Sequence, residues 1–416
     1  MKRSRWSGVG SVAWGAPLLA FGSLVTSCGA DASPVTVPPP ATDSRKATDR
    51  PVGAGVPALD YAFRFASAIV PDPKDRAKAQ ELAIDAFAAT GAWDEAIRRA
   101  DQVEGWRRGV VYADLAAGLA RAGRRDEAKA LVDKAETVRV TVEGWQNPRI
   151  ASHVAVALGA LGETEKARSM AAQVASEDPQ QYGGATAVHE ATRLAGTGDV
   201  GAALRQLRSL DGNNELEVIW ARVSGSLAIG RRADAPTKSR VAALKEARTA
   251  AARLPLERRL EALIGIAATY DSLGRPGPAR DVLREAADAV AELPSGDAAR
   301  IPFLIDLGGA WATAGSADRG RAALESAEPL VARALVIDQP GLYARVASGY
   351  RRIPDENEAR RLDLKALDSA AAMTISRPRA LAIAAICRQW GTDRVALDAP
   401  TRARLDGLLV GLGEPW

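Results

Sequence analysis

The sequence predicts an all-α fold made of stacked helix pairs, and three observations carry that prediction. The composition is 47% hydrophobic but only 5% aromatic, which favours helices packed through small side chains over a sandwich or barrel. Apolar residues recur at helical spacing from about residue 58 almost to the end. A small or turn-forming residue is repeatedly followed by a small residue five positions later: Gly91/Ala96, Gly123/Ala128, Gly162/Ala167, Gly198/Ala203, Gly274/Ala279, Gly315/Gly320 and Pro354/Ala359. Such self-similarity indicates small units that bury their apolar faces only against one another.

Residues 1–27 have the composition of a secretory signal, with a basic start followed by a short apolar stretch. The sequence Val25-Thr26-Ser27-Cys28 closes this segment and resembles the bacterial lipobox, with Val in place of the usual Leu. The resemblance implies that Cys28 carries a lipid. It also implies that the protein is exported and anchored to the cell membrane or outer membrane, facing the periplasm or exterior. The alternative interpretation is an uncleaved N-terminal anchor in which Cys28 has no role.

Residues 28–57 are rich in Pro, Ser, Thr and charged residues and show no apolar period. We expect a Pro-rich disordered tether that holds the folded part away from the membrane. Fully extended, a segment of this length reaches up to about 90 Å. Lipidation of Cys28 leaves Cys387 as the other cysteine, which excludes an intramolecular disulfide in the mature chain.

The charge pattern argues against nucleic acid as a partner. The formal net charge is +4, and three of the positive charges come from Lys2, Arg3 and Arg5 in the signal. No stripe of Lys and Arg interleaved with aromatic residues appears in the rest of the chain.

Each unit of the repeat array, residues 58–376, is expected to contain helix A, a tight turn and helix B. Acidic pairs fall where helix B begins: Asp94/Glu95, Asp126/Glu127 and Glu163/Glu165. Carboxylates at a helix start stabilise exposed amides and the positive end of the helix dipole. We therefore interpret these pairs as capping residues and not as general acids and bases.

Core positions recur relative to each turn. A large residue stands four positions before it: Phe87, Leu119, Leu158, Leu194, Tyr270, Trp311 and Tyr350. A small residue stands seven positions before most turns, as at Ala116, Ala155 and Ala267. This arrangement resembles the tetratricopeptide repeat family, which implies a right-handed superhelical solenoid of about eight antiparallel helix pairs. The 76-residue interval between Gly198 and Gly274 is expected to hold one irregular unit around Gly230.

Residues 377–416 predict two further helices that cap the open end of the array. We place the turn of this last unit at Gly391, which puts Cys387 at the large core position four residues earlier. A cysteine in that setting is expected to be a buried structural thiol.

His153 and His189 stand nine residues before their turns, as do Asp114, Asp306 and Arg345. Stacking of the units predicts a small polar ladder at this position. Further metal ligands are not evident, so we expect neither a metal nor a catalytic site. Residues 196–201 match G-x-G-x-x-G, but a helix and not a strand precedes them, so the glycines are expected to form a repeat turn. We expect no enzyme activity and no cofactor.

The inner face of the helix A series carries small residues at positions six and three before the turn: Ala117, Ala120, Val156, Gly159, Thr192, Ala195, Gly309 and Ala312. Near the C-terminal end this face becomes basic, with Arg351, Arg352 and Arg388. One interpretation is that the small residues only allow close helix packing. The other is a groove that binds a partner protein or peptide, with these arginines contacting an acidic group of the partner. His153 and His189 are further candidate partner-binding residues.

Glu104-Gly105-Trp106 and Glu143-Gly144-Trp145 repeat at the entry to helix A, and the tryptophans are expected to pack between neighbouring units. Together these patterns predict a non-catalytic, membrane-anchored scaffold of the bacterial cell envelope. The alternative is an auxiliary or regulatory subunit of an envelope enzyme or transport complex.

Overall fold

The computed structural model describes residues 56–177, 191, 199–209, 216–232 and 235–416, and all regular structure in them is helical. The predicted signal (1–27), most of the predicted tether (28–57), His189 and Gly198 lie outside the described residues. Inner helices are α2 (Pro73–Ala89), α4 (Trp106–Arg121), α6 (Gln146–Ala160), α10 (Leu216–Arg231), α12 (Leu256–Ser272), α14 (Arg300–Thr313), α16 (Gln339–Arg352) and α18 (Ser376–Thr392). Outer helices are α1 (Val56–Ser67), α3 (Trp93–Ala100), α5 (Arg125–Arg139), α7 (Thr164–Glu177), α9 (Val200–Arg208), α11 (Thr237–Ala251), α13 (Pro276–Glu292), α15 (Ala317–Val331), α17 (Glu356–Ala371) and α19 (Ala399–Val410).

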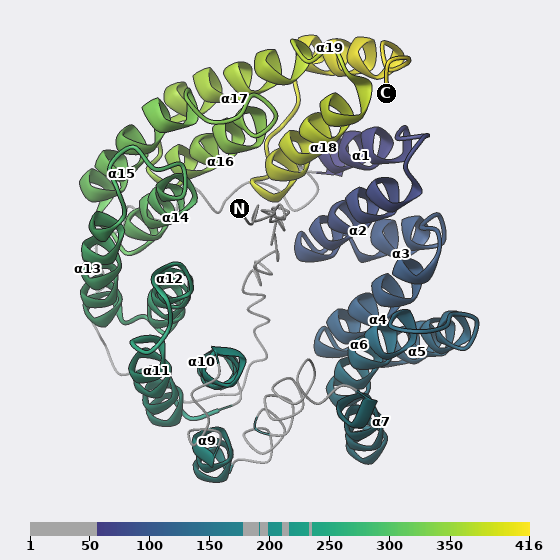
Figure 1. Ribbon diagram of the computed structural model, residues 1–416, viewed down its shortest axis with the longest axis vertical. Helices are drawn as coiled ribbons and strands as arrows, with labels where there is room; N and C mark the ends of the chain where they lie inside the picture. Colours follow the sequence, from purple (N-terminus) through teal and green to yellow (C-terminus); the bar gives the residue numbers. More distant parts are fainter. Residues whose placement is uncertain (1–55, 178–190, 192–198, 210–215, 233–234) are drawn as a thin grey trace, which may run out of the picture.

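The helices form an array of antiparallel pairs, as the sequence predicts. The inner helices from α2 to α16 pack on the outer helices that follow them, and neighbouring inner helices such as α4 and α6 or α14 and α16 pack on each other. The array curves around a central space, with the inner helices facing it (Figure 1). A single apolar core runs through most of the units, because each helix pair covers the apolar side of the next.

The turns between inner and outer helices share one hydrogen-bond pattern, which explains the periodic glycines. The amide of Ala92 donates to the carbonyl of Phe87 at 2.9 Å, and Arg124 donates likewise to Leu119. This bond closes a helix end when the residue before the donor has a left-handed conformation, which glycine adopts without strain. The predicted turn glycines have that conformation at Gly91, Gly123, Gly162, Gly274 and Gly315, with φ between 66° and 84°.

The last turn of this kind lies three residues beyond the predicted position. Arg394 has a φ of 55°, and the amide of Val395 donates to the carbonyl of Trp390 at 2.8 Å. The prediction of a turn at Gly391 was therefore wrong. Trp390 occupies the large core position, and Cys387 occupies the small one. Cys387 is fully buried, as expected, and burial raises the pKa of its thiol.

The 76-residue interval holds the pair α10 and α11, as expected for one additional unit. Gly230 is not a turn residue, because it lies inside α10. A Cβ atom at this position would come within 2.7 Å of Leu244 on α11, so glycine here allows the two helices to pack closely.

The two ends of the array pack against each other. The C-terminal helices follow the last repeat, where a cap was predicted, but α18 also packs along α1 as closely as the helices of one pair do. It contacts α2 in the manner of neighbouring inner helices. Arg64 of α1 pairs with Asp406 of α19 at 3.2 Å, and Arg377 of α18 pairs with Asp72 at 3.1 Å. α1 is thus the outer helix of a unit whose inner helix is α18, over 300 residues later.

We expect Phe65→Ala in α1 to loosen α18. Phe65 is fully buried, and removing such a side chain costs about 3–5 kcal/mol. Because α1 and α18 complete one unit, hydrogen exchange should increase in α18 while α12, on the far side of the ring, stays unchanged. Equal protection of α18 in the variant and the wild type would contradict the shared unit.

Candidate functional site

The candidate site is the inner wall of the ring. The small residues expected to line a smooth groove there divide into two kinds. Ala117 and Ala120 are buried, so they allow neighbouring helices to approach and do not face an open groove. Gly309 lies under the side chain of Arg352, since a Cβ atom at Gly309 would come within 2.6 Å of the guanidinium. Val156 on α6 is 43% exposed. Thr192 and Ala195 lie outside the described residues.

The polar ladder predicted nine residues before the turns exists as ion pairs between adjacent units. The Nδ1 atom of His153 on α6 lies 2.7 Å from Oδ1 of Asp114 on α4. Arg345 on α16 donates to Asp306 on α14 at 2.7 Å. Burial lowers the pKa of His153, but the Asp114 carboxylate outweighs burial, so the pKa is raised overall. The proposed neighbour His189 lies outside the described residues.

The junction of α18 and α2 places opposite charges on the inner wall. The pKa of Asp85 on α2 is raised to about 7, first by burial and then by the charges of Asp114 and Glu81, while Arg388 on α18 and His153 act to lower it. Burial lowers the pKa of Arg388, and the Asp85 carboxylate counteracts this effect. The meeting of the two ends of the helix array therefore creates an electrostatic interaction between Asp85 and Arg388 that spacing in the sequence does not reveal.

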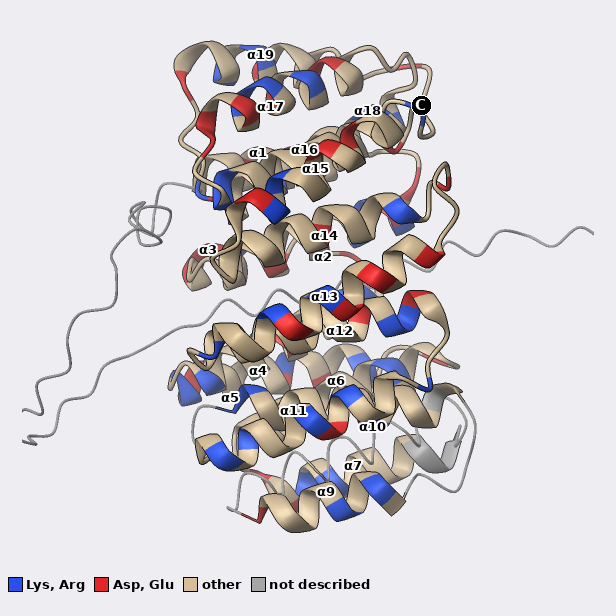
Figure 2. Ribbon diagram, turned by 90° about the vertical axis from the view of Figure 1, so that its left-hand side faces the viewer, with Lys and Arg blue, Asp and Glu red and all other residues tan. Residues whose placement is uncertain are grey.

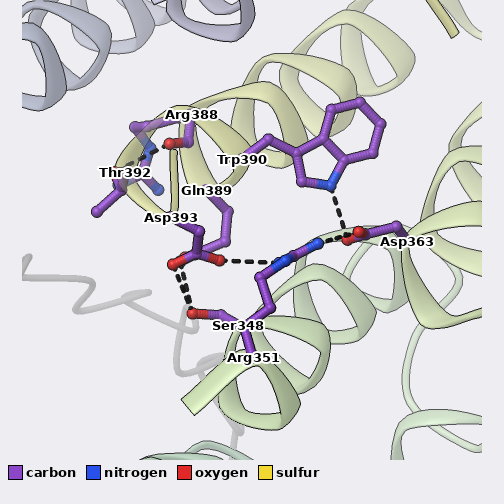
Figure 3. A network of polar contacts seen from close by, with 8 residues as sticks. All are labelled: Ser348, Arg351, Asp363, Arg388, Gln389, Trp390, Thr392 and Asp393. Carbon is purple, nitrogen blue, oxygen red and sulfur yellow. Dashed lines mark hydrogen bonds and ion pairs between the residues drawn. The ribbon is translucent and has the colours of Figure 1, made fainter. Parts of the chain in front are cut away.

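Arg351 does not belong to the inner surface, contrary to the prediction. Its guanidinium pairs with Asp363 and lies 2.9 Å from Oδ2 of Asp393 (Figure 3). Trp390 donates to Asp363 at 2.7 Å, and Ser348 donates to Asp393 at 2.8 Å. Only 8% of Arg351 is exposed. Burial raises the pKa of Asp363 to about 6, with Arg351 acting in the opposite direction. The arginine joins α16, α17 and α18 and is unavailable to a partner.

Arg352 and Arg388 remain as candidate binding residues. Arg352 is exposed at the end of α16, and Arg388 is partly exposed on α18. Among the residues that the structure describes, neither makes an ion pair, in contrast to Arg345 and Arg351. Their guanidinium groups can donate hydrogen bonds to a carboxylate from outside the chain.

The repeated tryptophans pack between neighbouring units, as expected. The ring centroids of Trp106 and Trp145 lie 5.0 Å apart in an edge-to-face arrangement. Gly105 and Gly144 before them have φ values of 66° and 61°, which explains the repeated Gly-Trp. Trp145 is nevertheless 63% exposed.

Open cavities that the sequence did not indicate lie on the outer surface of the described residues. One of about 490 Å³ lies between α5, α6 and α7, and one of about 640 Å³ lies between α11 and α13. In the second, Arg248 pairs with Glu285 and Arg259 with Glu292, so these two arginines are already compensated. Within the described ranges, no three His, Cys, Asp or Glu side chains are placed to hold a metal ion.

No family model and no curated protein matches this chain. Among solved structures, it is similar to the apo form of the quorum sensor NprR from B. thuringiensis, with 14% identity and a TM-score of 0.29. The match covers 76% of this chain and 97% of that chain. This similarity carries no assignment of function.

Arg351 and Arg352 are adjacent but are expected to respond differently to substitution. Arg351→Ala leaves Asp363 and Asp393 buried without their counter-charge, which costs about 3–5 kcal/mol. Arg352→Ala removes an exposed side chain and should change stability by less than about 0.5 kcal/mol. Urea unfolding of both variants checks this, and similar losses would contradict the buried role of Arg351.

Asp85 is expected to make stability depend on pH. Its pKa is raised in the folded state, so its contribution is complete below about pH 4 and is lost as the pH rises through about 7. Wild type should therefore lose stability relative to Asp85→Asn over this range, by at most about 4 kcal/mol, and the difference should level off above pH 8. Melting temperatures measured across pH 4–9 test this, and a difference independent of pH would rule it out.

Proposed function

We propose that the protein is a non-catalytic scaffold of the bacterial cell envelope that holds a partner protein or peptide against its inner wall. The observation that carries this proposal is the packing of α18 on α1 and α2. It joins inner helices from both ends of the chain into one wall, so a segment inside the ring contacts several units at once. Binding then depends on many contacts spread over the wall and not on one deep pocket.

The chemistry of the wall favours a partner with both acidic and apolar groups. Arg352 and Arg388 supply cations on neighbouring helices, and Val156 supplies an exposed apolar contact on α6. The paired residues Asp114, His153, Asp306 and Arg345 are already satisfied within the wall. Arg352 makes no ion pair among the described residues, and Arg388 feels the charge of Asp85 without forming an ion pair with it. A carboxylate-bearing segment therefore matches these arginines better than a basic one does.

The proposed location rests on Cys28, whose lipid would anchor the chain to a membrane after export. In the part of the chain that the structure describes, no helix has the length and apolar character needed to cross a bilayer. Attachment through a lipid at Cys28 would place the scaffold at the membrane surface, where its partner could be another envelope protein. If that partner is an enzyme or transporter, the protein would be its auxiliary subunit.

Capture of the partner from detergent extracts tests the inner wall. The double variant Arg352→Glu/Arg388→Glu should weaken capture by roughly tenfold or more, because repulsion replaces attraction for a carboxylate. Arg280→Glu on α13 is the matched control, since it changes an exposed arginine of the outer helices. Loss of a partner in the double variant alone supports the proposal. The same partners at the same yield in all three proteins would refute it.

A further inference from the structure

The two rims of the ring differ in their exposed apolar residues. On one rim, tight turns join each inner helix to its outer helix. On the other, the connections at 68–72, 101–105, 140–145, 252–255, 293–299, 332–338 and 372–375 lead from an outer helix to the next inner one (Figure 2). We call the second the connection rim and include in it the first residues of the inner helices and the last residues of the outer ones.

Most of the exposed large apolar residues among those described lie on the connection rim: Val70, Val140, Trp145, Leu216, Leu335, Val336, Ile337, Ile375 and Val410. Leu335 is 71% exposed and Val336 is 65% exposed. Val410 belongs to this rim because the next residue, Gly411, accepts a hydrogen bond from Arg379 at the start of α18. There are two exceptions among the described residues. Val156 of α6 lies on the inner wall, and Leu364 lies on the outside of α17.

The charges of the helix ends follow the same asymmetry. The turn rim carries the acidic first turns of the outer helices: Asp94, Glu95, Asp126, Glu127, Glu165, Asp318, Glu356 and Glu358. The connection rim carries arginines in the last turns of four longer outer helices: Arg64, Arg139, Arg205, Arg208 and Arg248. The first turns of α4, α6, α14, α16 and α18 hold no acid. The first turns of α2 and α12 hold the acids Asp75 and Glu257, and the last turns of α4, α10 and α16 bring arginines to the turn rim. The exposed apolar side chains therefore lie on the rim at which several outer helices end in arginine.

We propose that the connection rim lies on the surface of an anionic lipid bilayer, with its apolar tips in the interface. The tips are spread around the ring at separate connections, so a flat apolar phase contacts all of them, whereas a compact protein partner reaches only a few. Arginines beside them match the negative surface potential of anionic lipids. Trp145, held by Trp106 yet exposed, is the residue type favoured at such an interface.

This inference shares its membrane with the proposed function but rests on a different surface. The length of chain between Cys28 and α1 allows the connection rim and a lipid at Cys28 to meet the same bilayer. The outer helices, up to 17 residues long, span about 25 Å between the rims. The 28 residues from Cys28 to Val56 allow a reach of up to about 90 Å, so a lipid at Cys28 and the connection rim can meet one bilayer although α1 begins at the turn rim.

The experiment places a polarity-sensitive fluorophore at Val336→Cys in the full chain and uses Leu364→Cys as the control. Cys387 is buried and does not compete for the label, and the unsubstituted protein measures any labelling of Cys28. The probe is a vesicle of phosphatidylglycerol and phosphatidylcholine that contains nitroxide-labelled lipid. We expect the emission at position 336 to shift to the blue and to be strongly quenched, while that at position 364 stays unchanged.

Equal quenching at both positions would overturn the proposal. A blue shift at position 336 that grows with protein concentration in the absence of vesicles would overturn it too, since the rim would then bind a second copy. The anchor is tested separately by labelled palmitate: unchanged uptake in Cys28→Ser refutes lipidation there and leaves the quenching result intact. The capture experiment with Arg352→Glu/Arg388→Glu tests the inner wall alone. Failure of the proposed function can therefore be distinguished from failure of membrane binding by the connection rim.

Discussion

The architecture depends on the packing of α1 against α18. In an open array, the first and last units each present an apolar face to water, and terminal units must change composition to compensate. Here α1 and α18 cover each other and continue the same core. The pairing places Asp85 beside Arg388 and fixes which inner helices face one another. The inner wall and the two rims exist as continuous surfaces because this one apolar contact joins units that are far apart in sequence.

Local features of the fold could be predicted because they depend on residues close in sequence. The left-handed glycines, the acids at the starts of outer helices and the contact between Trp106 and Trp145 follow from short spacings. The last turn was misplaced because Gly391 is the residue type expected there, whereas the left-handed position is occupied by Arg394. Trp390 indicated the correct position of this turn, because in the other units a large residue stands four positions before the turn residue.

The sequence indicated which arginines lie near one another at the candidate site, but it did not indicate which of them are exposed. The periodicity placed Arg351, Arg352 and Arg388 near one another, yet exposure depends on the other helices that pack around each of them. Arg351 is buried by Asp363 and Asp393 from two further helices. The contact between Asp85 and Arg388 and the asymmetry of the rims both depend on how the array curves and meets its own beginning. Helical periodicity alone does not contain that information.

The distance along the chain between α1 and α18 has a consequence for folding. Tyr61 donates to the carbonyl of Arg402, a contact that spans 341 residues. During synthesis α1 emerges without the helices that cover its apolar side, and these helices follow only when nearly all of the chain has been made. Closing so long a loop slows the final step and leaves Phe65 and its neighbours accessible to chaperones in the meantime.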